Sequence, residues 1–94
     1  MTQPITPSQM FTYNGVTSNL YYADAGQGLP RHDHSFPHLT MCLSGKTLVR
    51  KENFERVMTP QDAPISLREN EWHEIEAVED STVFMNMFAV QESL

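Results

Sequence analysis

The sequence predicts an all-β protein with one domain, and three observations predict it. The 94 residues suffice for one hydrophobic core but not for two. From Phe11 onward, no window has the sustained i, i+3, i+4, i+7 spacing of apolar residues that is typical of a helix. Short runs rich in β-branched and aromatic residues alternate instead with turn signals, which favours a barrel or a sandwich.

Turn chemistry separates several of the expected strands. Asn14-Gly15 favours a type I′ hairpin, Ser44-Gly45 closes a second turn, and Asn70 suits a left-handed conformation before a late strand. The strands expected between such breaks cover residues 10–13, 19–23, 31–34, 38–43, 47–51, 54–58, 65–67, 72–77 and 82–90.

The first nine residues differ from the rest of the chain. Pro4 and Pro7 stand among polar residues without a periodic apolar pattern, which predicts either a mobile arm or an added edge strand. We therefore expect a flexible N-terminal arm over residues 1–9 and a barrel over residues 10–94.

Composition excludes some partners. Twelve acidic and six basic residues give a net charge of −6, which disfavours nucleic acids and anionic membrane surfaces. No stretch approaches the ~20 apolar residues of a membrane span, and the first residues do not resemble a signal peptide. Cys42 has no partner for an internal disulfide, which agrees with a reducing compartment. We expect a cytoplasmic protein, and its small size makes a homodimer a reasonable default.

The histidines give the strongest functional signal. His32, His34 and His38 fall within seven residues, and His73 lies far downstream. On an extended strand His32 and His34 point the same way with α-carbons about 7 Å apart, close enough for both rings to reach one ion. Surface histidines are common, so this spacing alone does not establish a metal site.

His38 needs a bend in the chain if it is to join the other two. On a straight strand its α-carbon would lie about 13 Å from that of His34. Pro37 cannot donate to a central ladder and favours a bulge or corner, so His38 is expected to return on the neighbouring strand. Beyond it, one face carries His38, Thr40 and Cys42 and the other is apolar.

Gly26, His32, His34, His38 and Gly45 fit the spacing G(X)5HXH(X)3E(X)6G, with His38 in place of the glutamate. This pattern resembles the first motif of the cupin family. The second motif, G(X)5PXG(X)2H(X)3N, is matched only by its histidine, placed on His73. Asp62, Arg68, Asn70 and Ala77 occupy its other positions, although Asn70 can mimic a turn glycine.

The resemblance implies a jelly-roll β-barrel with an open mouth, a central metal and, very often, a homodimer. The metal ligands would be His32, His34, His38 and His73, and imidazole suits Fe, Ni, Zn or Cu better than Mg or Ca. Three bound histidines leave positions open for a small-molecule ligand and dioxygen, whereas four around a tetrahedral zinc ion make a structural site.

The sequence leaves the function open. The leading hypothesis is a metal-dependent dioxygenase, or a related enzyme, that acts on a small oxygenated organic molecule. The alternatives are a non-catalytic ligand-binding cupin, a dimeric structural module with vestigial histidines, and an isomerase or epimerase with a histidine base. Other residues that could line the barrel, for each of which packing or solvation is the favoured role, are Tyr21, Tyr22, Thr40, Arg50, Glu52 and Asn86.

Overall fold

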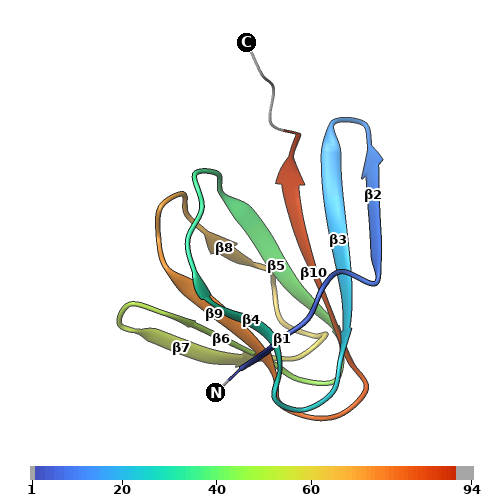
Figure 1. Cartoon of the computed structure of the whole chain (residues 1–94), viewed down its shortest axis with the longest axis vertical. Coiled ribbons are helices and arrows are strands. Elements are labelled where there is room, and N and C mark those ends of the chain that lie inside the picture. The colour runs from blue at the N-terminus through green and yellow to red at the C-terminus, as the bar shows by residue number, and fades with distance from the viewer. Residues whose placement is uncertain (1, 91–94) are drawn as a thin grey trace.

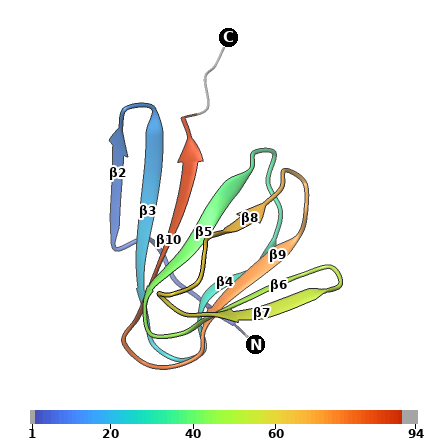
Figure 2. The ribbon, with the colours of Figure 1, turned by 180° about the vertical axis from the view of Figure 1, so that it is seen from behind.

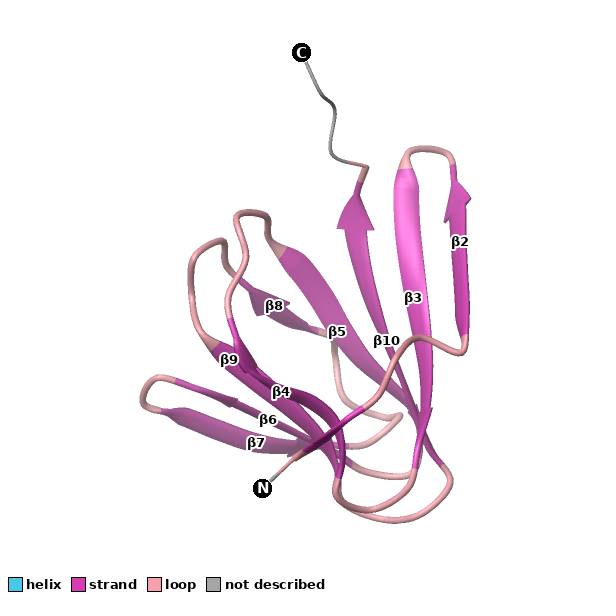
Figure 3. Cartoon of the chain, in the orientation of Figure 1, coloured by secondary structure: helices cyan, strands magenta, loops and turns pink. Residues whose placement is uncertain are grey.

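The structure, a computed structural model, describes residues 2–90 and consists of strands and turns without a helix in that range (Figure 3). Within these residues, no helix is long and apolar enough to cross a membrane. The ten strands are β1 (Gln3–Pro4), β2 (Gln9–Tyr13), β3 (Val16–Ala23), β4 (Gln27–His32), β5 (His38–Ser44), β6 (Thr47–Lys51), β7 (Phe54–Met58), β8 (Ile65–Leu67), β9 (His73–Ala77) and β10 (Thr82–Ala89).

The strands form two five-stranded sheets (Figure 1). The β4 sheet has the order β1-β4-β9-β6-β7, and the β10 sheet has the order β2-β3-β10-β5-β8. All pairings are antiparallel except the short parallel pairing of β1 with β4. This is the jelly-roll arrangement that the sequence predicts, and the all-β fold class is confirmed.

The two sheets are tied together at one end and diverge toward the other, as Figure 2 shows from behind. At the closed end, the backbone N–H of Ala25 donates to Asp80 at 3.0 Å and that of Ser81 donates to Asp24 at 3.2 Å. At the opposite end, the N–H of Asn70 donates to the carbonyl of His34 at 2.7 Å, which joins the β8–β9 and β4–β5 loops. A cavity lined by His32, His34 and His38 lies at this second end, where the sheets diverge.

The core lies between the sheets because alternate residues of each strand face inward. Phe84 is fully buried at the centre of β10, and its ring stacks on that of Tyr21 with centroids 4.8 Å apart. Ile75 and Val49 face them from the β4 sheet and are equally buried. Gly28 allows close packing, since a Cβ there would collide with the carbonyl oxygen of Ile75.

Most expected strands are confirmed within one residue, but the strand expected over 19–23 begins earlier, at Val16, and the strand expected over 31–34 is wrong. The observed β4 covers Gln27–His32 and ends before His34. Its first residues lack period-2 alternation, and its register against β9 shifts between Leu29 and His32, across Pro30. The expected turns are confirmed: Asn14 and Gly15 have φ of 55° and 82°, and Asn70 has φ of 60°.

The N-terminal segment adds an edge strand to the β4 sheet. Gln3 and Pro4 pair with Gln27 and Gly28, and the buried Thr2 hydroxyl contacts Glu74 at 3.0 Å and Glu76 at 2.6 Å. The edge-strand alternative is thus the one observed, while the flexibility of residues 1–9 stays a prediction. Met1 and residues 91–94, which belong to the predicted arm and barrel, lie outside the described residues.

Candidate metal centre

The four histidines meet at the open end of the jelly roll. His32 ends β4 and His73 begins β9, and the two are direct partners in the register of the β4 sheet. His38 begins β5 in the β10 sheet, and His34 lies in the loop that connects β4 with β5. Both sheets therefore contribute to one cluster.

The bend predicted between His34 and His38 is confirmed, but two details of the prediction are wrong. His34 lies beyond the end of β4 and so is not part of an extended pair with His32. After the bend, β5 does not neighbour β4 but belongs to the opposite sheet. The chain crosses between the sheets at Pro37, so His38 approaches the cluster from the other side.

Three of the histidines form a group that could hold a metal ion. One ring nitrogen from each of His32, His34 and His73 lies within 4.8 Å of the other two. Nitrogens bound to one zinc ion at about 2.1 Å in tetrahedral geometry lie about 3.4 Å apart, so the three rings would have to move closer together to bind one ion. The ring centroids of His32 and His73 are 4.4 Å apart, the shortest separation in the cluster.

Backbone carbonyl groups fix the tautomer of the same three rings. The Nδ1 atoms of His32, His34 and His73 lie 2.7, 2.7 and 2.9 Å from the carbonyl oxygens of Pro30, Phe36 and Glu71. Because a carbonyl oxygen only accepts, each Nδ1 must carry the proton and donate it. The Nε2 atom of each neutral ring then keeps its lone pair, as a metal ligand requires.

Two buried nitrogens in the cluster have no hydrogen-bond partner among the described residues. They are the Nε2 atoms of His38 and His73, and these two residues are 5% and 0% exposed respectively. An unsatisfied buried polar atom is costly and calls for an explanation such as an ion. The residues therefore fit a bound divalent transition metal both in donor type and in the atoms left without partners.

His38 is close to the cluster without belonging to the three-histidine group. Its ring centroid lies 4.9 Å from that of His34 and 5.0 Å from that of His73. The structure therefore brings together all four histidines that the sequence singles out, and it places one ring nitrogen from each of three of them within 4.8 Å of the other two. Binding of an ion by all four stays a prediction.

Burial keeps two of the rings neutral. The loss of solvent, followed by repulsion from His73, His34 and His32, lowers the pKa of His38 to about 3. Burial lowers the pKa of His73 to about 4; the hydrogen bond to Glu71 opposes this shift, and the nearby His32 and His34 add to it. At neutral pH both rings therefore offer a lone pair without first losing a proton.

These shifts predict how the stability of the metal-free protein depends on pH. Since the folded-state pKa values lie below the unfolded value of about 6.5, the unfolded chain binds more protons as the pH falls below 6.5. Each ring should then cost about 1.4 kcal/mol of unfolding free energy per pH unit between that value and its folded pKa. Urea unfolding at pH 7.5, 6 and 5 should show this decline below pH 6.5, with a smaller slope in His38→Gln. A constant free energy from pH 7.5 to 5 would contradict the assignment.

A cavity of about 170 Å³ adjoins the cluster. His32, His34 and His38 border it, whereas His73 is fully buried and is not among the lining residues. Phe36 stacks on His34 with centroids 4.3 Å apart, and Phe88 lies 4.9 Å from Phe36. The other residues that line the cavity are Asn19, Tyr21, Leu29 and Asn86.

The six further residues that could line the barrel differ in whether they face the interior or the outside of the sheets. Tyr21, Thr40 and Asn86 are buried between the sheets, whereas Tyr22 is 55% exposed and Glu52 lies in an exposed turn. Cys42 is buried on the face of His38 and Thr40, and its thiol contacts the carbonyls of Ser44 and Gly45 instead of the cluster.

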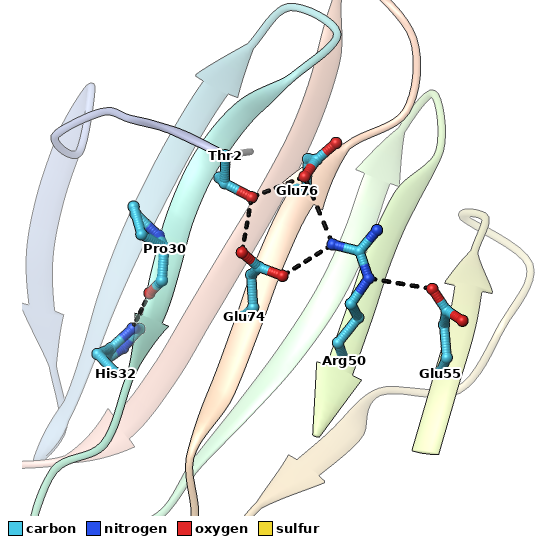
Figure 4. A network of polar contacts seen from close by, with 7 residues as sticks. All are labelled: Thr2, Pro30, His32, Arg50, Glu55, Glu74 and Glu76. Atoms are coloured by element: carbon cyan, nitrogen blue, oxygen red, sulfur yellow. Dashed lines mark hydrogen bonds and ion pairs between the residues drawn. The ribbon is translucent and has the colours of Figure 1, made fainter. Parts of the chain in front are cut away.

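Arg50 faces outward from the β4 sheet, so an interior position for it is wrong. It lies between Glu55, Glu74 and Glu76 at 3.0, 2.8 and 3.5 Å (Figure 4). These partners sit opposite it on β7 and β9, where alternation carries side chains to the outer face. Glu74 is therefore part of an ion-pair network on the outer face of this sheet.

Sequence comparison gives no family for this chain, because no family model matches it and no curated protein sequence matches it. Structure comparison is informative. KdgF from Halomonas sp. has a TM-score of 0.78 at 16% identity over 90% of this chain and 78% of that protein. A cupin superfamily protein from Desulfitobacterium hafniense gives 0.71 at 12% identity, over 93% and 83% of the two chains.

A cupin-2 domain protein from Shewanella frigidimarina gives a TM-score of 0.73 at 10% identity, over 96% of this chain and 85% of that protein. Similarities at this level of identity define a fold. The chain has the fold of the small cupins, as its first motif suggests, and it carries a histidine cluster that could bind a metal.

Proposed function

We propose that this chain is a small metal-dependent cupin that binds one divalent transition ion through His32, His34 and His73, with His38 as the fourth ligand. The observation that supports it best is the closeness of one ring nitrogen from each of three histidines beside a cavity, with a backbone carbonyl bound to the Nδ1 atom of every ring. A bound Fe, Ni, Zn or Cu ion would supply Lewis acidity and, for a redox-active metal, electron transfer to dioxygen.

The residues of the chain would control that chemistry in three ways. Neutral imidazoles add no negative charge, so the ion keeps its full formal charge and favours anionic ligands such as carboxylates, enolates or catecholates. The carbonyls of Pro30, Phe36 and Glu71 hold the rings in orientation. The apolar walls formed by Phe36 and Phe88 keep water away from a ligand in the cavity.

We propose a dioxygenase, or a related enzyme, that acts on a small oxygenated organic molecule. The test is oxygen uptake by the iron-loaded protein in the presence of catechol, a 2-hydroxy acid or a β-diketone. Iron-dependent uptake with at least one of these compounds, lost in His34→Ala, is the expected result. Full iron occupancy without uptake would favour the second candidate, a non-catalytic small-ligand-binding cupin, which the cavity beside the histidines also suits.

We also propose that the chain acts as a homodimer. Register places the outward-facing residues of the β10 sheet on one continuous surface, and none of them is charged. Two copies with a net charge of −6 repel each other least where their surfaces meet at such a face. These residues include Gln9, Phe11, Tyr13, Val16, Leu20, Tyr22, Leu39, Met41, Ser66, Val83, Met85 and Met87.

A pair of matched substitutions tests the dimer. Leu39 on this face is 39% exposed, and Val57 on β7 of the other sheet is 46% exposed. Light scattering after size exclusion should give twice the chain mass for the wild type and Val57→Glu, but a single chain mass for Leu39→Glu, since a buried unpaired charge is costly. A wild type that is monomeric at 100 µM, or a Leu39→Glu variant that stays dimeric, would contradict the proposed interface.

A further inference from the structure

Two asparagines face each other in the wall of the cavity beside the histidines. Asn19 of β3 and Asn86 of β10 are direct partners in the antiparallel register, so their side chains leave the sheet on the same side. Both line the cavity that His32, His34 and His38 border. Neither residue belongs to the histidine cluster.

The hydrogen bonds of this pair are incomplete in a way that points to a ligand. The Thr40 hydroxyl donates to Asn86 Oδ1 at 2.7 Å. The NH2 group of Asn86 is therefore the part of this side chain that can donate to a ligand. The Asn19 amide interacts with the Tyr21 hydroxyl, but its Oδ1 atom is buried and has no partner among residues 2–90. The acceptor Asn19 Oδ1 and the donor NH2 group of Asn86 are thus on adjacent residues, but Asn19 Oδ1 accepts no hydrogen bond from that group.

We propose that Asn19 and Asn86 form a subsite for a hydroxyl group of the ligand. A hydroxyl can donate its proton to Asn19 Oδ1 and accept from the Asn86 NH2 group, which satisfies both side chains at once. A ligand without a donor would leave the Asn19 oxygen buried and unpaired.

The other residues that line the cavity indicate the size and polarity of the rest of the ligand. Phe36, Phe88 and Leu29 give the cavity apolar walls, and no lysine or arginine is among its lining residues. Its volume of about 170 Å³ is below the range of roughly 300–1,000 Å³ that is typical of pockets for drug-sized ligands. The subsite therefore selects a small hydroxylated compound with a compact apolar body.

This subsite deepens the proposed function, on which it rests for the ligand's position beside the metal. Recognition of the hydroxyl group by Asn19 and Asn86 does not require a bound metal. The two ideas can be separated by making the same measurement on metal-free protein and on protein incubated with zinc, which leaves nuclear magnetic resonance signals sharp.

The test compares phenol with fluorobenzene, which has nearly the same shape but no proton to donate. Titrations of the full chain are followed through the side-chain amide signals of its asparagines. Phenol should bind about tenfold more tightly than fluorobenzene, the effect expected for one buried acceptor, and should shift the Asn86 signal. Asn19→Leu should abolish this preference, whereas Asn19→Asp, which keeps an acceptor oxygen, should retain it.

Equal affinities for the two probes in the wild type, no binding of phenol, or an undiminished preference in Asn19→Leu would each overturn the subsite. If Asn19→Leu does not fold, the wild-type comparison of the two probes decides. A phenol preference in a protein that takes up no zinc would support the subsite and count against a zinc ion at the histidine cluster. Zinc uptake without a preference for phenol would support the metal centre and refute the subsite.

Discussion

Zinc should raise the melting temperature of the wild-type chain by about 15–30 °C when the free ion exceeds its dissociation constant about 1,000-fold. Binding to the folded state alone at that excess contributes about 4 kcal/mol, and a domain of this size gains about 4–8 °C per kcal/mol. His73→Ala should lose most of this shift, because it removes a fully buried ligand from the three-histidine group. Differential scanning calorimetry with and without zinc measures both.

Two further variants show whether the shift in melting temperature comes from the histidine cluster and how many histidines bind the ion. Cys42→Ala should keep the full shift, since the Cys42 thiol contacts backbone carbonyls instead of the cluster. His38→Ala separates a site with three ligands, which keeps most of the shift, from one with four, which loses it. A shift of the same size in His73→Ala and the wild type would mean that zinc stabilises the chain somewhere else.

Phe84→Ala should lower the free energy of unfolding by about 3–5 kcal/mol, the usual range for a buried aromatic side chain. Phe84 is fully buried between the sheets and stacks on Tyr21, so its removal creates a cavity and breaks a ring contact. Met85 is next to it on β10 but faces outward. Urea unfolding should therefore show a loss of less than about 1 kcal/mol for Met85→Ala at concentrations where the chain is monomeric. Equal losses for the two variants would contradict the inward and outward assignment of β10.

The sequence was sufficient for the fold class because local signals agree with the global arrangement. The β-branched runs, the Asn14-Gly15 turn and the left-handed Asn70 all act locally, and each is found where it was expected. The grouping of His32, His34 and His38 also needed only spacing and a bend before Pro37.

The remaining features depend on contacts between distant segments. The start of β4 at Gln27 has no alternation of its own and is set by pairing with β1 and β9. The role proposed for Asn19 depends on its register with Asn86, and neither residue carries a local signal that fixes its face. The outward position of Arg50 likewise follows from pairing with β7 and β9.

The measurement that tests the central claim most directly is the metal content of the protein purified without a metal-affinity tag. Elemental mass spectrometry should find near one equivalent of iron, nickel, copper or zinc in the wild type and much less in both His34→Ala and His73→Ala. These two rings reach the cluster from the β4–β5 loop and from β9, so a joint loss would establish one shared site. No metal in the wild type, or metal that neither substitution removes, would contradict the assignment of the histidine cluster as a metal centre.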